Sequence, residues 1–182
     1  MKVKPVTRFT SDGKEITIRE ATEYDALNLI ELKKSYIKGT RSIPLYEFEY
    51  KNDIQMEKDL IKRFHTEENS LLLVAEHGNN LVGNIDLSGN QRTKLLHTGM
   101  IGMGIAYEWQ NRKIGSFLMG SLLDWAAESP LLKIIWLEVY ATNTGGIKLY
   151  EKFGFESCGH IKDFFMEENP ADKLTMVKYL NS

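Results

Sequence analysis

The chain has 182 residues, of which 42% are hydrophobic and 26% charged, with a formal net charge of −2. This composition is typical of a soluble globular domain, and the interleaved acidic and basic residues argue against a nucleic-acid partner. No segment approaches the ~20 apolar residues that cross a bilayer, so we expect one cytoplasmic domain over residues 1–182 with no membrane partner.

The N-terminal part of the chain predicts a strand followed by a helix. Residues 1–13 are predicted to be a flexible lead-in, and residues 15–20 alternate apolar and polar side chains, as a half-buried strand does. Thr22 stands at an N-cap position with Asp25 three residues later. Apolar residues at helical spacing follow, and Gly39 ends the helix.

The middle of the chain predicts a helix and three strands. Residues 40–53 are expected to form a loop, and residues 54–66 a second amphipathic helix. Two apolar runs within residues 70–89 are joined by Gly78-Asn79-Asn80, which is typical of a β-hairpin. A further strand, unusually rich in glycine, is predicted over residues 97–107.

The C-terminal part predicts two helices among the remaining strands. The helices are expected over residues 115–128 and 143–153, separated by a buried strand over residues 133–141. Two last strands, over residues 155–166 and 173–180, flank the turn "EENPAD".

These elements predict an α/β (α+β) fold with a single-domain sheet. Strand 97–107, helix 115–128 and strand 133–141 form a β-α-β unit, so the two strands should be parallel. The other strands are linked by hairpins and should be antiparallel. We therefore expect a mixed, mostly antiparallel sheet of about seven strands with a central parallel pair, flanked by about four helices.

The stretch "EWQNRKIGSF" (108–117) predicts an anion site. Where a strand enters a helix through a tight loop, several backbone N–H groups and the positive end of the helix dipole converge on one point. Arg112 and Lys113 add positive charge at its rim, and Gly115 permits close approach of a ligand. The same residues would also suit an ordinary solvated loop.

Other classes of site find little support in the sequence. No Gly-x-x-x-x-Gly-Lys-Ser/Thr string is present, and Tyr107 stands where a dinucleotide fingerprint requires its third glycine. The single cysteine excludes an intramolecular disulfide, and the four histidines show no paired short spacing, so we predict no metal site.

Two strings together resemble the GNAT superfamily of N-acetyltransferases, which move acetyl from coenzyme A to amines. "GIAYEWQNRKIGSFLM" carries the loop pattern Gln/Arg-x-x-Gly-x-Gly/Ala at residues 110–115. "LEVYATNTGGIKLYEKFGF" carries Asn-x-x-Ala-x-x-x-Tyr-x-x-x-Gly-Phe at residues 143–155. The chain departs from these patterns at Lys113, where the family prefers Gly, and at Gly146, where it has Ala.

The resemblance implies a GNAT-like sheet whose parallel strands splay apart to admit the pantetheine arm of acetyl-CoA, the co-substrate. On this basis Gly102 and Gly104 remove bulk near the arm, although they would equally permit tight packing against a helix. Asn143 would bind pantetheine, cap its helix, or do both. The residues that would bind the co-substrate through their backbone or side chains are Ile105, Tyr107, Gln110, Asn111, Arg112, Lys113, Ile114, Gly115 and Ser116.

The resemblance also implies catalytic residues. Tyr150 stands at the position of the general acid that protonates the departing thiolate, although it would also fit as a core tyrosine. Glu138 lies twelve residues earlier, as does the proposed base in the branch that acetylates N-termini of ribosomal proteins. His97 and a water relay are the alternatives for the base.

The function implied is acetyl-CoA-dependent N-acetylation of a primary amine on a small molecule or on a peptide or protein N-terminus. The alternative is a GNAT-like protein that binds coenzyme A but is catalytically weak, acting as a sensor or structural subunit. The acceptor would be shaped by residues 22–68 and 164–171, and its identity is not encoded in any motif. A homodimer is the expected assembly, since dimers are the commonest soluble oligomers.

Overall fold

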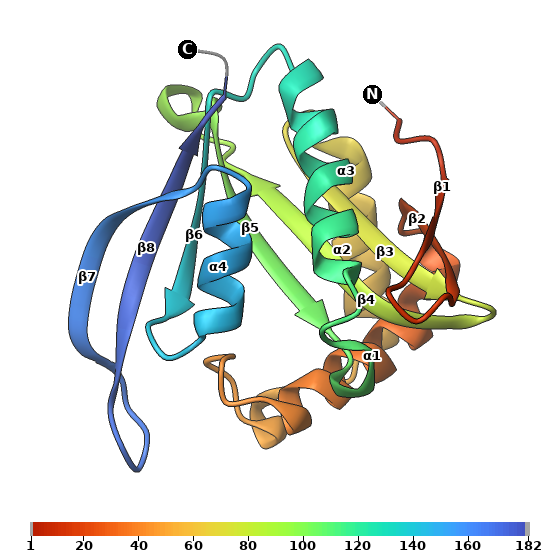
Figure 1. Cartoon of the computed structure of the whole chain (residues 1–182). Coiled ribbons are helices and arrows are strands. Elements are labelled where there is room, and N and C mark those ends of the chain that lie inside the picture. Colours follow the sequence, from red (N-terminus) through yellow and green to blue (C-terminus); the bar gives the residue numbers. More distant parts are fainter. Residues whose placement is uncertain (1, 181–182) are drawn as a thin grey trace.

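The computed structural model describes residues 2–180, which form one mixed sheet covered by helices on both faces (Figure 1). The eight strands lie in the order β1-β2-β3-β4-β5-β6-β8-β7. The strands are β1 (Val6–Phe9), β2 (Glu15–Glu20), β3 (Leu71–His77), β4 (Asn80–Gly89), β5 (Thr98–Ile105), β6 (Ile134–Tyr140), β7 (Glu156–Phe165) and β8 (Ala171–Tyr179). The helices are α1 (Ala26–Gly39), α2 (Ile54–Thr66), α3 (Ile114–Glu128) and α4 (Thr144–Lys152).

Two apolar clusters fix the layers. Helix α3 packs its buried residues, among them Leu118 and Leu122, on the face of the sheet that carries Ile85 and Leu87, and α4 lies beside it (Figure 1). Helices α1 and α2 cover the opposite face, where Leu29 and Ile61 join a separate cluster. Because side chains alternate along a strand, β3 and β4 supply residues to both clusters.

The parallel strands β5 and β6 separate after a short shared stretch, as the family resemblance implies. Their pairing covers only Thr98–Met100 against Ile134–Trp136. Beyond that point β5 remains paired to β4, and β6 to β8. The edges of β5 and β6 that face each other therefore carry no ladder hydrogen bonds over their second halves, where a ligand can insert.

Most predicted elements are confirmed, with one addition at the N-terminus. Helix α2 has the predicted bounds, and β3 and β4 form the predicted hairpin around Gly78, whose φ of 59° suits glycine. The expected flexible lead-in over residues 1–13 instead contains β1, which pairs antiparallel with β2 and raises the number of strands to eight in the described chain. A four-residue edge strand leaves too short a pattern to be recognised in the sequence.

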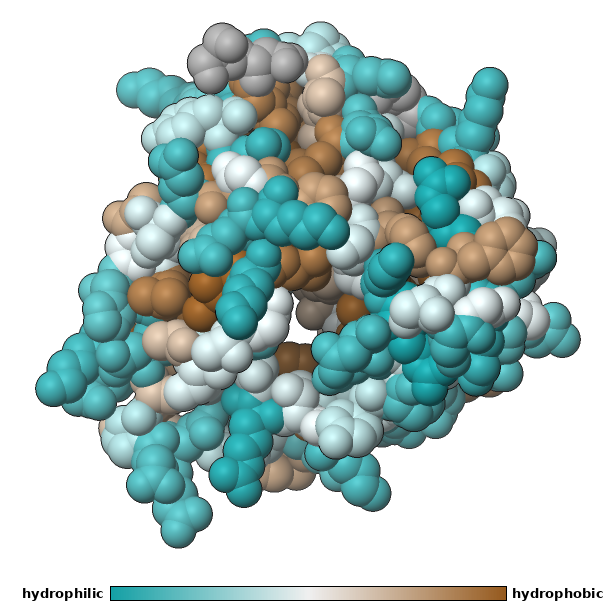
Figure 2. Space-filling view, in the orientation of Figure 1, coloured by the Kyte–Doolittle hydropathy of each residue, from teal (hydrophilic) through white to brown (hydrophobic). Residues whose placement is uncertain are grey.

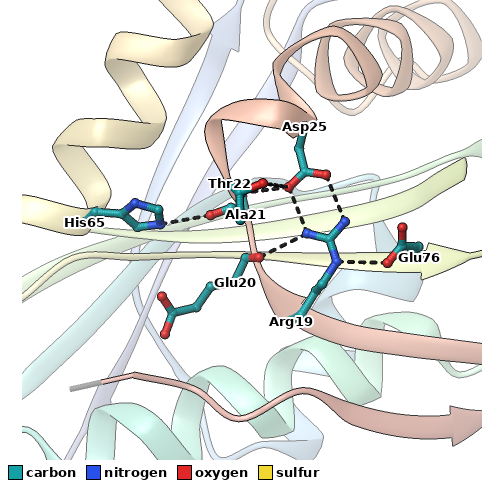
Figure 3. A network of polar contacts seen from close by, with 7 residues as sticks. All are labelled: Arg19, Glu20, Ala21, Thr22, Asp25, His65 and Glu76. Carbon is teal, nitrogen blue, oxygen red and sulfur yellow. Dashed lines mark hydrogen bonds and ion pairs between the residues drawn. The ribbon is translucent and has the colours of Figure 1, made fainter. Parts of the chain in front are cut away.

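A polar network joins the first helix to the sheet (Figure 3). The guanidinium of Arg19 on β2 donates to both carboxylate oxygens of Asp25 at 2.8 Å and to Glu76 on β3 at 2.8 Å. The Asp25 carboxylate also accepts from the backbone N–H and hydroxyl of Thr22, the predicted cap residue. Burial alone would raise the pKa of Asp25, but the hydrogen bonds from Arg19 and Thr22 outweigh it and lower that pKa.

No helix in residues 2–180 combines the length and apolar character needed to cross a bilayer.

Candidate active site

The predicted anion loop leads from β5 into α3 through two left-handed residues. After a 3₁₀ turn at Tyr107–Trp109, Asn111 has a φ of 60° and Lys113 a φ of 71°, and α3 begins at Ile114. Asparagine tolerates this conformation, whereas lysine pays roughly 1–2 kcal/mol for it. Lys113 occupies the position where the family prefers glycine, and its φ is positive. Its backbone is therefore strained.

The loop presents a run of backbone donors. The first N–H of α3 that makes an intrahelical bond is that of Phe117, which donates to the Lys113 carbonyl at 3.1 Å. The N–H groups of residues 111–116 have no hydrogen-bond partner in the described part of the chain. This set of donors at the positive end of a helix fits the oxygens of a diphosphate.

Gly115 sets how closely α3 approaches its neighbours. A Cβ on Gly115 would lie 3.0 Å from Leu149 Cδ2 on α4, 3.2 Å from Ile105 Cδ1 and 3.4 Å from Met103 Sδ on β5. The absence of a side chain therefore allows the start of α3, the end of β5 and α4 to meet at one point.

A cavity of about 400 Å³ opens at this meeting point. Figure 2 shows the molecule hollowed here, between the N-terminal ends of α3 and α4, with apolar residues at the bottom of the hollow. The lining combines the end of β5, the loop and the start of α3, and residues along α4. Residues of α1 and the following loop complete it on the other face of the sheet. The cavity thus extends through the gap between β5 and β6, joining both layers. The sequence-predicted residues in the lining are Ile105, Gln110, Asn111, Lys113, Ile114, Gly115, Ser116, Asn143 and Tyr150.

Tyr150 of α4 packs its ring on the core and borders the cavity. The ring meets Phe155 edge-on, with centroids 6.1 Å apart, and lies among the apolar residues around α3. Its hydroxyl has no hydrogen-bond partner among residues 2–180, and burial raises its pKa. Tyr150 is therefore both a core residue and a cavity residue. Its ring packs on the core, and its neutral hydroxyl remains free to donate a hydrogen bond.

Asn143 both caps α4 and borders the cavity. Its Oδ1 accepts from the N–H of Gly146 at 3.0 Å, and the same side chain is part of the lining. A Cβ on Gly146 would lie 2.8 Å from Asn143 Nδ2. Glycine at this position, where the family has alanine, therefore makes room for the capping amide.

Three of the predicted site residues lie outside the lining. The Tyr107 side chain is 68% exposed, and its carbonyl accepts from Gln110 N–H. Arg112 pairs with Asp12 and lies over Trp109, so its charge is directed toward the β1–β2 turn. Glu138 accepts from Lys173 Nζ at 2.6 Å on the α1/α2 face.

His97, the other candidate base, precedes β5. Its carbonyl accepts from the backbone N–H groups of Lys133 and Ile134. Its side chain is not part of the cavity lining.

The sequence did not single out the residues of α1 and its following loop that border the cavity. These are Tyr36, Thr40, Ser42 and Ile43. The available signal was Gly104, one of the glycines of this glycine-rich strand, since a Cβ there would lie 2.2 Å from Tyr36 Cε1. Gly104 therefore permits tight helix packing and also borders the cavity.

Among the described residues, no group of three or more His, Cys, Asp or Glu side chains is placed to hold a metal ion. The cavity lining offers backbone amides, the phenols of Tyr36 and Tyr150, and the hydroxyl groups of Thr40, Ser42 and Ser116.

Comparison with known proteins agrees with this geometry. A profile of the Acetyltransferase (GNAT) family matches residues 31–155. The L-amino acid N-acetyltransferase AaaT of Escherichia coli (strain K12) is 27% identical over 152 residues, covering 82% of this chain and 88% of that protein. The crystal structure of a GNAT-family acetyltransferase from Streptococcus pneumoniae superposes with a TM-score of 0.88 at 23% identity, covering 91% of this chain and 99% of the other.

A second solved structure carries a ligand. The protein yncA of Salmonella typhimurium, solved with its cofactor acetyl-CoA, superposes with a TM-score of 0.81 at 16% identity and covers 92% of this chain and 95% of its own. The family profile spans the helix, the splayed strands and the loop that build the cavity. The chain belongs to the Acetyltransferase (GNAT) family, and it is an N-acetyltransferase.

Proposed function

We propose that the protein transfers the acetyl group of acetyl-CoA to a primary amine, on a small molecule or on a peptide or protein N-terminus, by direct attack on the thioester. The observation that carries this proposal is one cavity that connects the unpaired amides of residues 111–116 with the free hydroxyl of Tyr150. Support also comes from family membership and from the acetyl-CoA bound to the Salmonella typhimurium neighbour.

The donor would be held along the cavity by backbone groups. The amides of residues 111–116 suit the diphosphate, and the unpaired edge of β5 at Ile105 suits the amide groups of pantetheine. Asn143 would contact pantetheine with the part of its side chain that the cap leaves free. Arg112 would contribute only long-range charge, because its guanidinium is paired with Asp12.

Tyr150 would act as the general acid. As the amine nitrogen bonds to the thioester carbon, the carbon–sulfur bond breaks and a thiolate departs. The raised pKa of Tyr150 keeps its phenol protonated at neutral pH, so it can give its proton to sulfur and regain one from the nitrogen. No group of the described chain competes for that hydroxyl through a hydrogen bond.

The test is thiol release from acetyl-CoA with a panel of amines. The panel should contain L-amino acids, which the name of the Escherichia coli relative indicates for that protein, together with diamines and peptides with free N-termini. We expect Tyr150→Phe to lower kcat by at least 100-fold while the Kd for coenzyme A changes less than threefold. Full activity of this variant would exclude Tyr150 as the acid.

The alternative is a protein that binds coenzyme A without efficient turnover. It is favoured by one observation: β5 carries no acidic side chain, and the carboxylate of Glu138 is paired with Lys173. Tight coenzyme A binding without thiol release for any amine would establish this alternative in place of catalysis.

A further inference from the structure

A polar patch lies on the face of the central sheet that α1 and α2 cover. Ile85 and Leu87 of β4 point into the core beneath α3, so the alternate residues Asn84 and Asp86 point to the other face. Across the ladder, Asn84 pairs with Gly104 and Asp86 with Gly102. The two glycines place no side chains beside the two polar residues. The space that they leave is taken by the Asp86 carboxylate over Gly102 and by the Tyr36 ring over Gly104.

Asp86 is a half-buried carboxylate without a counter-ion in contact with it. Within residues 2–180 no Lys, Arg or His nitrogen lies within 4.0 Å of it, and its hydrogen bond from Ser88 Oγ is long, at 3.4 Å. Lys33, the nearby cation on α1, donates to Glu57 at 2.6 Å instead. Burial raises the pKa of Asp86 to about 6, partly offset by Lys33, by Ser88 and by Arg63 of α2. A partly desolvated carboxylate with no cation in contact favours binding of one.

Two buried polar groups on the α1/α2 side of the sheet have no hydrogen-bond partner in the described chain. Asn84 is 3% exposed, and its Oδ1 is buried with no hydrogen-bond partner in the described chain. The hydroxyl of Tyr50, from the loop between α1 and α2, is likewise buried without a partner. Each such group costs roughly 1–3 kcal/mol unless a ligand or water satisfies it. Unpaired oxygen acceptors on the same side of the sheet as the Asp86 carboxylate suit a primary ammonium, because an ammonium has three N–H donors.

Tyr36 connects this patch with the cavity. Its ring lies over Gly104 and forms part of the cavity lining. Asp86 lies over Gly102 and Tyr36 over Gly104, two residues apart on the same face of β5. Burial raises the pKa of Tyr36, and the charge of Asp86 raises it further. The patch of Asn84 and Asp86 therefore adjoins the end of the cavity that reaches the α1/α2 face, opposite the diphosphate loop.

We propose that Asn84 and Asp86 form the seat of the acceptor's primary ammonium group and that Asp86 takes the first proton from it. This inference rests on the proposed function and defines its acceptor as a cationic primary amine entering from the α1/α2 face. The deprotonated nitrogen forms the new bond to the thioester carbon, and the carbon–sulfur bond breaks. The second nitrogen proton replaces the one that Tyr150 gives to sulfur, while Asp86 later releases its proton to solvent.

The position of Asp86 distinguishes it from Glu138 as the base. The Glu138 carboxylate is neutralised by Lys173, whose ammonium lies 2.6 Å away and also sits over the Phe164 ring. Asp86 has no such partner and adjoins the cavity through Tyr36. A carboxylate with a pKa near 6 is also a better match to an amine than an ordinary aspartate.

The binding test uses n-propylamine as a probe and n-propanol as its uncharged counterpart, each titrated into the protein saturated with coenzyme A. We expect saturable binding of the amine only, weakened at least tenfold in Asp86→Asn and unchanged in Asp124→Asn, a matched change at an exposed site on α3. Failure of the amine to bind, or equal affinity in Asp86→Asn, would overturn the proposal. Because the readout is binding, it holds even if no acetyl transfer is detected.

The kinetic test uses whichever amine of the panel is acetylated. Asp86→Asn should lower kcat/KM at least 100-fold with coenzyme A affinity unchanged, and the rise in rate with pH near 6 should disappear. The groups that act on Asp86 and tune this rise are Lys33, Tyr36, Glu57, Arg63 and Ser88. If Glu138→Gln loses this rise in rate near pH 6 while Asp86→Asn stays fully active, the base is Glu138. That result would overturn the role of Asp86 but leave the proposed function standing.

A second variant, Gly102→Ala, tests the same site without changing Asp86, in case Asp86→Asn does not fold. Gly102→Ala keeps the carboxylate but places a Cβ 3.0 Å from Asp86 Oδ1, closer than ordinary contact. We expect it to weaken n-propylamine binding severalfold with coenzyme A affinity intact. Asp86→Asn itself should raise Tm at pH 7, because an aspartate whose pKa is raised by folding destabilises the fold above its unfolded pKa. An unaffected amine affinity in Gly102→Ala would contradict the proposed seat.

Discussion

The ring of Tyr36 on α1 lies directly against the backbone of Gly104 on β5, so closely that a Cβ on Gly104 would lie 2.2 Å from Cε1 and 2.4 Å from Cζ. This contact seats α1 on the strand at the point where β5 has lost its pairing with β6. It also brings the phenol into the lining of the cavity. The width of the cavity at the α1/α2 face therefore depends on one glycine.

Gly104→Ala should destabilise the fold by about 1–3 kcal/mol, because the added methyl overlaps the Tyr36 ring and forces α1 to shift. The midpoint and slope of urea unfolding would measure this loss. The loss of stability caused by Gly104→Ala should be unchanged when Tyr36→Phe is also present, because phenylalanine keeps the ring. It should be smaller when Tyr36→Leu is also present, because leucine removes the ring. An equal penalty in the Leu background would show that the contact does not determine the packing.

Two glycines of α3 offer a matched pair for the donor site. Gly115→Ala places a Cβ 3.0 Å from Leu149 and 3.2 Å from Ile105, and should weaken coenzyme A binding at least tenfold by moving the start of the helix. Gly120→Ala adds the same methyl where the nearest atom, on Phe153, is 3.9 Å away, and should stabilise the helix by roughly 0.5–1 kcal/mol. Calorimetric titration of coenzyme A would measure both, and similar affinities would argue against the proposed seat of the diphosphate.

Lys113→Gly tests the strain in the anion loop. The φ of 71° costs lysine roughly 1–2 kcal/mol, whereas glycine adopts it freely but loses roughly 0.4–1 kcal/mol through its more flexible unfolded state. We expect a net stabilisation of up to about 1 kcal/mol in thermal or urea unfolding. Lys113→Ala keeps the strain and removes the same charge, so it should show no gain. Stabilisation by both substitutions would trace the effect to charge instead.

The pairing of Arg19 with Asp25 predicts a pH-dependent stability. Since folding lowers the pKa of Asp25, its contribution is fully present above the unfolded pKa of ~3.9 and is lost as the pH falls through the folded value. Asp25→Asn should lower the free energy of unfolding by about 2–3 kcal/mol at pH 7. This loss is slightly smaller than that from breaking a fully buried ion pair, because Arg19 keeps its hydrogen bond to Glu76. Urea unfolding between pH 7 and pH 3 should show the two proteins converging, and a constant difference would contradict this account.

The fold was largely predictable because its signals are local. Hairpin glycines, helix caps and the β-α-β order are read from neighbouring residues, and they determine which strands pair. The short β1 could not be predicted because its four residues carry too weak a pattern. The turn that follows β1 carries Asp12, which pairs with Arg112, 100 residues later in the sequence. No local pattern reveals that the cation expected at the phosphate site is already paired.

The donor half of the site was predictable and the acceptor half was not, for a physical reason. Backbone amides at a helix start depend on chain direction and a glycine, both of which are visible in the sequence. In "NIDLSG" (84–89), by contrast, Asn84 and Asp86 alternate with apolar residues and resemble a solvent-facing side. Only packing shows that α1 covers them and that the opposing positions on β5 are glycines.

Backbone amide spectra recorded during titration with coenzyme A alone test the central claim most directly. If the diphosphate binds where β5 enters α3, the ¹H–¹⁵N signals of residues 111–116 should shift most, with smaller shifts at Asn143 and Tyr150. Signals of these residues that stay in place while those of another surface move, for example the β7–β8 hairpin, would contradict the account.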